Sequence, residues 1–105
     1  MIARIWHGYT TRENSSVYEI MLKEEIITGI KRRKIKGFID IDLLVRKLAD
    51  EVEFVTIMRF DSLDSIKEFA GNDHEMAVIY PDAKPLLLRY DERSQHYEIR
   101  HSLSA

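Results

Sequence analysis

The chain has 105 residues and a formal net charge of −2, with 45% hydrophobic and 32% charged residues. This length predicts one domain, residues 1–105, and the composition is ordinary for a soluble globular protein. The near-neutral charge gives no field that would attract nucleic acid or an anionic membrane. The absence of cysteine excludes disulfides and thiolate chemistry, and it suits a cytoplasmic location. No apolar run has the length of a membrane span, and the N-terminus lacks that of a signal peptide.

Residues 2–9 predict a first strand, because apolar side chains fall on both of its faces. Two capping-box patterns follow, and they place a first helix at about residues 12–29. The apolar side chains of this helix form one stripe, and we expect Gly29 to end it.

A basic connector, residues 31–36, leads to a second strand over residues 38–46. Alternate positions of this strand are apolar, while Asp40 and Asp42 lie on its other face. Residues 49–51 form a polar turn between two apolar runs, which predicts a hairpin into the next strand.

Residues 53–71 form the clearest pattern in the chain: a strand, a polar corner and a short helix. Residues 54–60 are almost continuously apolar, which favours a strand covered on both faces. Asp61 or Ser62 can cap the helix that follows, and Gly71 can end it in a conformation that glycine tolerates.

The last third is less regular. We expect a short irregular helix over residues 72–79, broken at Tyr80-Pro81. Residues 82–90 fit either a strand, through the leucines 86–88, or a short helix capped by Asp82 with Pro85 in its first turn, and we favour the helix. Residues 95–102 predict the last strand.

This order of elements predicts an α+β fold, the ferredoxin-like split βαβ topology with an antiparallel sheet. The first and third strands are apolar on both faces, yet one layer of helices covers only one face. A second copy of the chain, packed sheet to sheet, is the simplest cover. We therefore expect a homodimer.

The sequence resembles the antibiotic biosynthesis monooxygenase family, whose members are dimeric α+β barrels of about this length. The resemblance runs nearly end to end and is carried by residues 1–4, 37–38, 53–54, 60–66, 69–71, 77–78, 91–93 and 96–99. It implies one of two chemistries. Some members oxidise aromatic compounds with dioxygen and no bound cofactor, and others degrade haem.

The haem degraders carry an Asn on the first strand, a Trp on the second helix and a His shortly after it. Here His7, Phe69, and Ile79 or Tyr80 stand at those positions, so the resemblance argues against haem degradation. It implies no cofactor. Phe60 also stands where relatives often have Trp.

Six side chains are candidates for a site. Trp6 and His7 point to opposite faces of their strand, so one of them faces the space between sheet and helices. His7 could act there as a base near neutral pH, or could instead be hydrogen-bonded at a dimer interface. Trp6 could equally be a core aromatic.

Arg59 could hold an anionic ligand, or could pair with Asp40, Asp42 or Asp61. Tyr80 and Tyr90 could donate hydrogen bonds to a ligand, although tyrosines often combine a buried ring with a solvent-exposed hydroxyl. Phe69 becomes a pocket candidate only through the resemblance, and is otherwise core.

Two other kinds of site lack support. The four histidines are scattered, with His96 and His101 on opposite strand faces and His74 in a polar, solvated cluster, so we expect no metal site. Residues 36–38 begin like an RNA-recognition signature, but Asp40 and Asp42 follow and would repel phosphates.

The leading hypothesis is a cofactor-independent monooxygenase of a small aromatic or quinol-type metabolite. The alternative is a non-catalytic ligand-binding or stress-related dimer that keeps the fold without the chemistry. The lack of a convincing acid–base pair favours the alternative.

Overall fold

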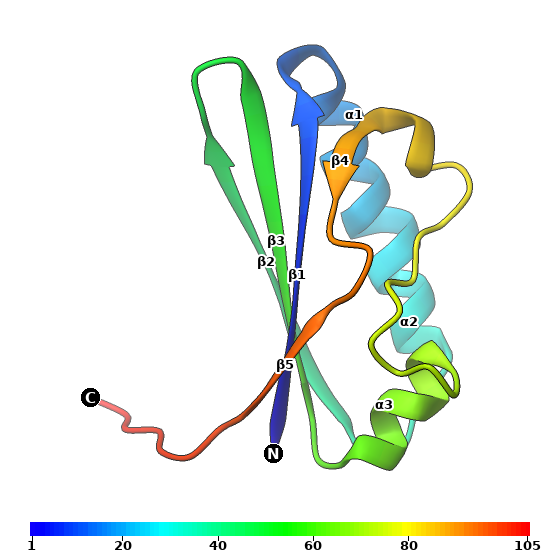
Figure 1. Ribbon diagram of the computed structural model, residues 1–105, viewed down its shortest axis with the longest axis vertical. Helices are drawn as coiled ribbons and strands as arrows, with labels where there is room; N and C mark the ends of the chain where they lie inside the picture. The colour runs from blue at the N-terminus through cyan, green and yellow to red at the C-terminus, as the bar shows by residue number, and fades with distance from the viewer.

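The computed structural model describes all 105 residues and shows one twisted sheet with helices on a single face (Figure 1). None of the helices combines the length and the apolar character needed to cross a membrane. The elements in chain order are β1 (Ile2–Thr11), α1 (Arg12–Met21), the π-helical η1 (Leu22–Ile27), α2 (Thr28–Arg32), β2 (Phe38–Lys47), β3 (Glu51–Phe60), α3 (Leu63–Ala70), the 3₁₀ turn η2 (Lys84–Leu86), β4 (Leu87–Tyr90) and β5 (Gln95–Glu98).

The sheet is antiparallel throughout, in the order β2-β3-β1, with β4 and β5 both paired to the free edge of β1. β4 pairs with the end of β1 and β5 with its start, so these two short strands together complete the sheet. This arrangement confirms the predicted ferredoxin-like topology and the predicted hairpin between β2 and β3.

The pairing of β1 with β3 decides which side chains face the helices. It runs without a break from Ile2 opposite Phe60 to Thr11 opposite Glu51. Because side chains alternate along a strand, the even-numbered residues of both strands face the helices. The odd-numbered residues face away from them, onto a side of the sheet that no element covers (Figure 1).

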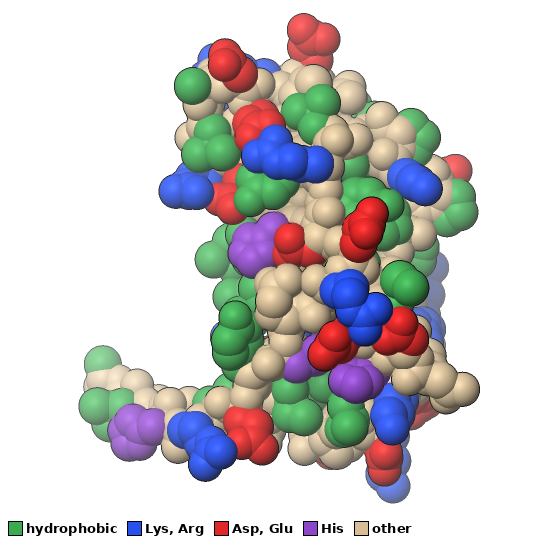
Figure 2. Space-filling view, viewed as in Figure 1, with side chains coloured by type: hydrophobic (Ala, Val, Ile, Leu, Met, Phe, Trp, Pro, Cys, Tyr) green, Lys and Arg blue, Asp and Glu red, His purple; other side chains and the backbone are tan.

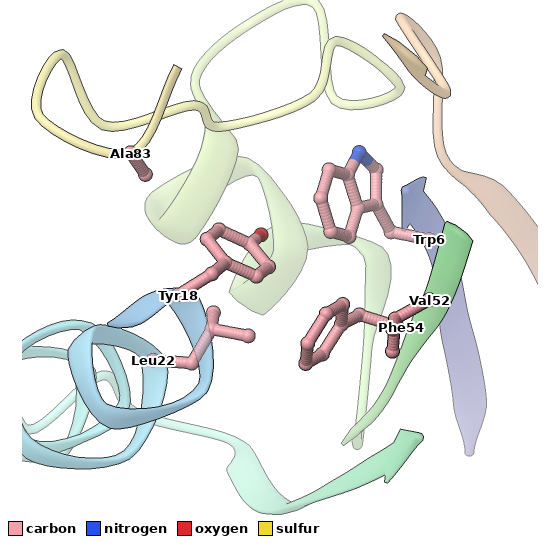
Figure 3. Packing of buried hydrophobic residues seen from close by; sticks show 6 residues of the cluster. All are labelled: Trp6, Tyr18, Leu22, Val52, Phe54 and Ala83. Atoms are coloured by element: carbon pink, nitrogen blue, oxygen red, sulfur yellow. The ribbon is translucent and has the colours of Figure 1, made fainter. Parts of the chain in front are cut away.

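Two groups of buried side chains fill the space between sheet and helices. In the first, Tyr18 of α1 meets Phe54 of β3 edge-on, with ring centroids 4.8 Å apart (Figure 3). The second gathers around Phe60 and Phe69, whose centroids are 5.9 Å apart. Aromatic pairs of this kind stabilise a core beyond the area that they bury.

The first helix is longer than predicted. The helical segments α1, η1 and α2 follow one another directly through residue 32, and Thr11 caps them by accepting a hydrogen bond from Asn14 N at 3.1 Å. Gly29 does not end the helix, because its carbonyl still accepts from Arg33 N at 3.2 Å. Ile30 is buried one residue later, and this packing holds the last turn in helical form.

The predicted start and end of α3 are confirmed. Ser62 caps it by accepting from Ser65 N at 3.2 Å, and Gly71 ends it with a φ of +97°. Asp61 also supports this corner, because its carboxylate accepts from Ser65 Oγ at 2.9 Å.

Two helix predictions in the last third were wrong. Residues 72–79 form no helix, because their backbone groups pair with residues 92–94: Ala77 N donates to Glu92 O at 2.9 Å, and Ser94 N donates to Glu75 O at 2.7 Å. Residues 82–90 form only the short η2 turn before β4, because the edge of β1 offers strand partners there. The last strand ends at Glu98 instead of residue 102, and an exposed tail follows.

We expect Gly37→Ala to destabilise the protein by at least about 1–2 kcal/mol. Gly37 has a φ of +87°, and a Cβ there would overlap Ser65 Oγ and the Asp61 carboxylate. Gly29→Ala is the matched control, since a Cβ at this helical position meets no atom within 4 Å. It should stabilise by about 0.5–1 kcal/mol. Urea unfolding measures both, and equal effects would contradict this account of the corner.

Candidate functional site

A mostly apolar cavity lies between the sheet and the helices. It is lined by 17 residues, of which 14 are hydrophobic, and its polar lining comes from Arg4, Thr56 and Ser94. The walls come from β1, β3, the long helix, α3 and the loop over residues 78–83. Figure 3 shows part of this wall, formed by Trp6 of β1, Tyr18 of α1 and Ala83 of the loop before η2.

The cavity is small. It leaves about 60 Å³ for the centres of water-sized molecules. For comparison, an engineered apolar cavity of about 150 Å³ binds one benzene ring, so binding of a ring here requires the walls to move outward.

The long helix changes form where it borders this cavity. Three cavity residues, Leu22, Ile26 and Ile27, belong to the π-helical segment η1. A π-helical turn widens a helix locally, and such turns are frequent at functional sites. Here the irregularity presents three branched apolar side chains to the ligand space.

Arg4 is the main polar group of the cavity. Its side chain is buried, with the residue only 3% exposed, and burial lowers the pKa of the guanidinium to about 10. It donates hydrogen bonds to the His74 carbonyl, to Met76 O at 2.9 Å and to His96 Nε2 at 3.0 Å. It also stacks on Phe69, with 5.4 Å between Arg4 Cζ and the ring centroid. Because this pKa lies well above 7, the guanidinium of Arg4 stays charged at neutral pH.

A cluster of histidines lies behind Arg4. The rings of His74 and His96 are 5.4 Å apart, and together with Glu75 they place possible ligand atoms within 4.8 Å of one another. Figure 2 shows histidines beside acidic and basic side chains on this surface. The sequence analysis did not predict this cluster, because nothing in the sequence indicated that residues 72–76 fold back toward β5.

This cluster is built as a hydrogen-bonded network and is poorly suited to a cation. Arg4 donates to His96 Nε2 and so occupies the lone pair that a metal would need. The pKa of His96 falls to about 4, mainly through burial and then through the charge of Arg4. The neutral ring is left with a buried Nδ1 that has no partner.

The loop from Gly71 to Ala83 closes the cavity opposite the sheet. Arg93 holds it by pairing with Asp73 at 2.8 Å and with Glu75 at 3.1 Å. A bridge between Met76 and Arg93 adds backbone contact. These exposed ion pairs are individually weak, so the wall of the cavity that they hold is its most easily moved part.

Three of the six predicted site residues line the cavity: Trp6, Phe69 and Tyr80. The indole of Trp6 donates to Asp91 O at 2.9 Å, which fixes the ring against the pocket. Burial raises the pKa of Tyr80, so its hydroxyl stays protonated and can donate a hydrogen bond. Tyr90 packs against Trp6, with ring centroids 6.3 Å apart, and is not part of the lining.

His7 and Arg59 lie on the other face of the sheet. His7 Nδ1 is 2.6 Å from Asp91 Oδ2, and Arg59 pairs with Asp40 at 2.8 Å and Asp42 at 3.0 Å. The predicted ion pairs of Arg59 are thus present. The expected role of His7 as a base in the cavity does not fit, because Trp6 takes the inward position of that residue pair.

The sequence reading missed Arg4 and Ser94. Arg4 stands two residues before Trp6 and therefore shares its strand face. A charged residue on the inward face of an apolar strand is the signal that could have identified it. Ser94 gives no such signal, because the turn that buries it follows β4, a segment for which the sequence favoured a helix.

Comparison with known proteins gives relatives in structure only. No protein-family model and no curated protein matches the sequence. Two matching structures are each described as a "putative antibiotic biosynthesis monooxygenase". The first, from Bacillus cereus, has 21% identity and a TM-score of 0.69 over 100% of this chain and 96% of that one. The second, from Deinococcus radiodurans, has 15% identity and a TM-score of 0.64 over 100% and 98%.

A third structure is SnoaB, a cofactor-independent oxygenase from Streptomyces nogalater. It has 14% identity and a TM-score of 0.58, over 99% of this chain and 98% of that one. Identities this low show a shared fold. The chain therefore has the fold of the antibiotic biosynthesis monooxygenases, as its resemblance to that family predicted.

The half-buried His96 should make stability depend on pH. In the unfolded chain its pKa is about 6.5, and in the folded protein it is about 4. Between these values only the unfolded chain takes up the proton, so the folded state loses stability as the pH falls through this range. Above about pH 6.5 the group has no effect.

We expect His96→Gln to lose less thermal stability than the unchanged protein between neutral pH and about pH 5. His101→Gln, on the exposed tail, is the control and should keep the original pH profile. Melting temperatures measured across this range test the prediction. A His96→Gln profile parallel to that of the unchanged protein would show that His96 does not titrate as described.

Proposed function

We propose that the protein is a cofactor-independent monooxygenase that oxidises a small aromatic or quinol-type compound in the cavity. The observation that carries this proposal is the cavity itself, a small and largely apolar space between sheet and helices. The fold is shared with SnoaB, which performs oxygenation without a cofactor. An apolar pocket both favours an aromatic ring and keeps water from the reacting atoms.

Such a reaction balances with dioxygen as the only oxidant. A hydroquinone would exchange one ring C–H bond for a C–O bond and become a hydroxyquinone. One oxygen atom enters the product, and the other leaves as water with the two hydrogens that the substrate loses. The electron-rich ring supplies all four electrons, so the protein needs to position the ring, exclude water and stabilise charge.

The side chains of the cavity match these tasks. Trp6, Phe69 and Tyr18 offer flat apolar surfaces for a ring, and the Tyr80 hydroxyl can donate a hydrogen bond. No Asp, Glu or His side chain lines the cavity. That absence of a base favours the second candidate function, a non-catalytic protein that binds the same class of ligand.

We also propose that the open face of the sheet packs on a second copy of the chain. Its centre is apolar and partly exposed, and the side chains that form it are Ala3, Ile5, Leu44, Val55, Ile57 and Tyr97. Polar pairs surround it, including the ion pair of Arg59 with Asp42 and the contact of His7 with Asp91. An apolar centre with a polar rim is the composition of a protein interface.

The oxygenase proposal predicts oxygen uptake with single-ring hydroquinones above the uncatalysed rate. Ile79→Trp should fill the cavity and lower the rate at least about tenfold, because binding of the ring is lost. Ile20→Trp makes the same substitution at an exposed helix position and is the control. An oxygen electrode measures the rate, and melting temperatures confirm that both variants fold.

Two results would contradict the proposal. Uptake that is equal in Ile79→Trp and Ile20→Trp would place the reaction outside the cavity. Tight binding of the hydroquinones without oxygen uptake would identify the protein as the non-catalytic binder.

The dimer proposal predicts that light scattering gives the mass of two chains at micromolar concentration. Ile57→Glu should yield a monomer, because it buries a charge at the centre of the apolar face. Leu63→Glu is the control, since it adds the same charge at an exposed position in the first turn of α3. A monomer in the unchanged protein would refute the interface.

A further inference from the structure

The cavity contains a positive charge that no acidic group of the protein neutralises. Arg4 forms no ion pair, and its three hydrogen-bond partners are two backbone carbonyls and a neutral imidazole. The Glu75 carboxylate lies near His96 but pairs with Arg93. A buried cation without a counter-ion is costly, and buried charges are normally paired.

Arg4 also keeps donors available. A guanidinium has five N–H groups, and the contacts of Arg4 use two on Nη1 and one on Nη2. The Nε–H and one N–H of Nη2 remain without a protein partner. Guanidinium donors suit the oxygen of an anion, and such charge-assisted hydrogen bonds are the strong ones.

Ser94 supplies a second, independent sign of a missing ligand. It is only 4% exposed, lines the same cavity, and its hydroxyl has no hydrogen-bond partner. Buried hydroxyl groups are normally hydrogen-bonded, so an unpaired one beside a ligand space indicates a polar group of the ligand. A ring with an oxygen substituent would satisfy both Arg4 and Ser94.

We propose that Arg4, assisted by Ser94, binds the ligand as an oxyanion, so that the ligand class is a one-ring phenolate or quinolate. This rests on the proposed function in one respect, that the cavity is the ligand site. No carboxylate or histidine lines the cavity to remove a proton. The hydroxyl proton of the ligand therefore passes to bulk water, and Arg4 holds the anion that remains.

The ionised form is also the reactive one. A quinolate gives an electron to dioxygen more readily than the neutral quinol, because it already carries the negative charge. By stabilising that anion at neutral pH, Arg4 would raise the amount of the form that reacts. The charge of Arg4 thus replaces the base that the cavity lacks.

The test uses 4-nitrophenol, whose colour reports its ionisation and which ionises near neutral pH. 4-Nitroanisole, its neutral methyl ether, is the matched probe. We expect the bound phenol to ionise at least about one pH unit lower than the free phenol, a tenfold preference for the anion. Absorbance during pH titration, with and without saturating protein, measures the shift.

Two arginine variants make this test specific. Arg4→Met should abolish the tenfold preference, while 4-nitroanisole still binds. Arg33→Met is the matched control, because Arg33 also stacks on Phe69 at 5.4 Å but does not line the cavity. It should keep the preference.

Ser94→Ala tests the same site independently, in case Arg4→Met does not fold. Its hydroxyl has no partner to lose, so the melting temperature should not fall. Binding of 4-nitrophenolate should weaken several-fold, and binding of 4-nitroanisole should be unchanged.

The outcomes separate this inference from the proposed function. If both probes bind equally well and the phenol keeps its free titration, anion binding is refuted while the cavity remains a ligand site. Retention of the preference in Arg4→Met would likewise overturn the assignment. If neither probe binds, the cavity is not a ligand site, and the proposed function fails with it.

Discussion

The pairing of β1 with β3 is the constraint on which the other features depend. Ten consecutive residue pairs join the two strands. Since side chains alternate along each strand, this one register turns Arg4, Trp6 and Met58 toward the helices and His7 and Arg59 away from them. A shift of one residue would exchange the two faces. The same set of hydrogen bonds therefore determines which residues line the cavity and which residues form the proposed interface.

Arg4 joins this sheet to the wall that closes the cavity. Its hydrogen bonds to the carbonyls of His74 and Met76 bind the loop from Gly71 to Ala83, which has little regular structure of its own. The same guanidinium contacts the ring of Phe69 in α3. A ligand anion on Arg4 would thus touch the group that holds the wall in place. On the proposed assignment, ligand binding and closure of the cavity would be linked through one side chain.

The parts of the fold that the sequence predicted are those with local causes. The corner at Asp61 and Ser62 is specified by its own capping side chains, and the alternation of β2 is visible in ten residues. Residues 72–94 could not be predicted, because their backbone partners lie on segments distant in sequence. For the site, alternation showed that either Trp6 or His7 faces inward. Only the register of the formed sheet shows that it is Trp6, and that Arg4 accompanies it.

The two faces of the sheet are connected through Asp91. Its backbone carbonyl accepts from the indole of Trp6, on the cavity side, at 2.9 Å. Its carboxylate accepts from the backbone N–H of His7 at 3.0 Å and lies 2.6 Å from the ring of His7, on the open side. Any group that moves His7, including a partner subunit on that face, therefore acts on the residue that orients Trp6. The open face of the sheet and the wall of the cavity are in this way joined through one hydrogen-bonded residue.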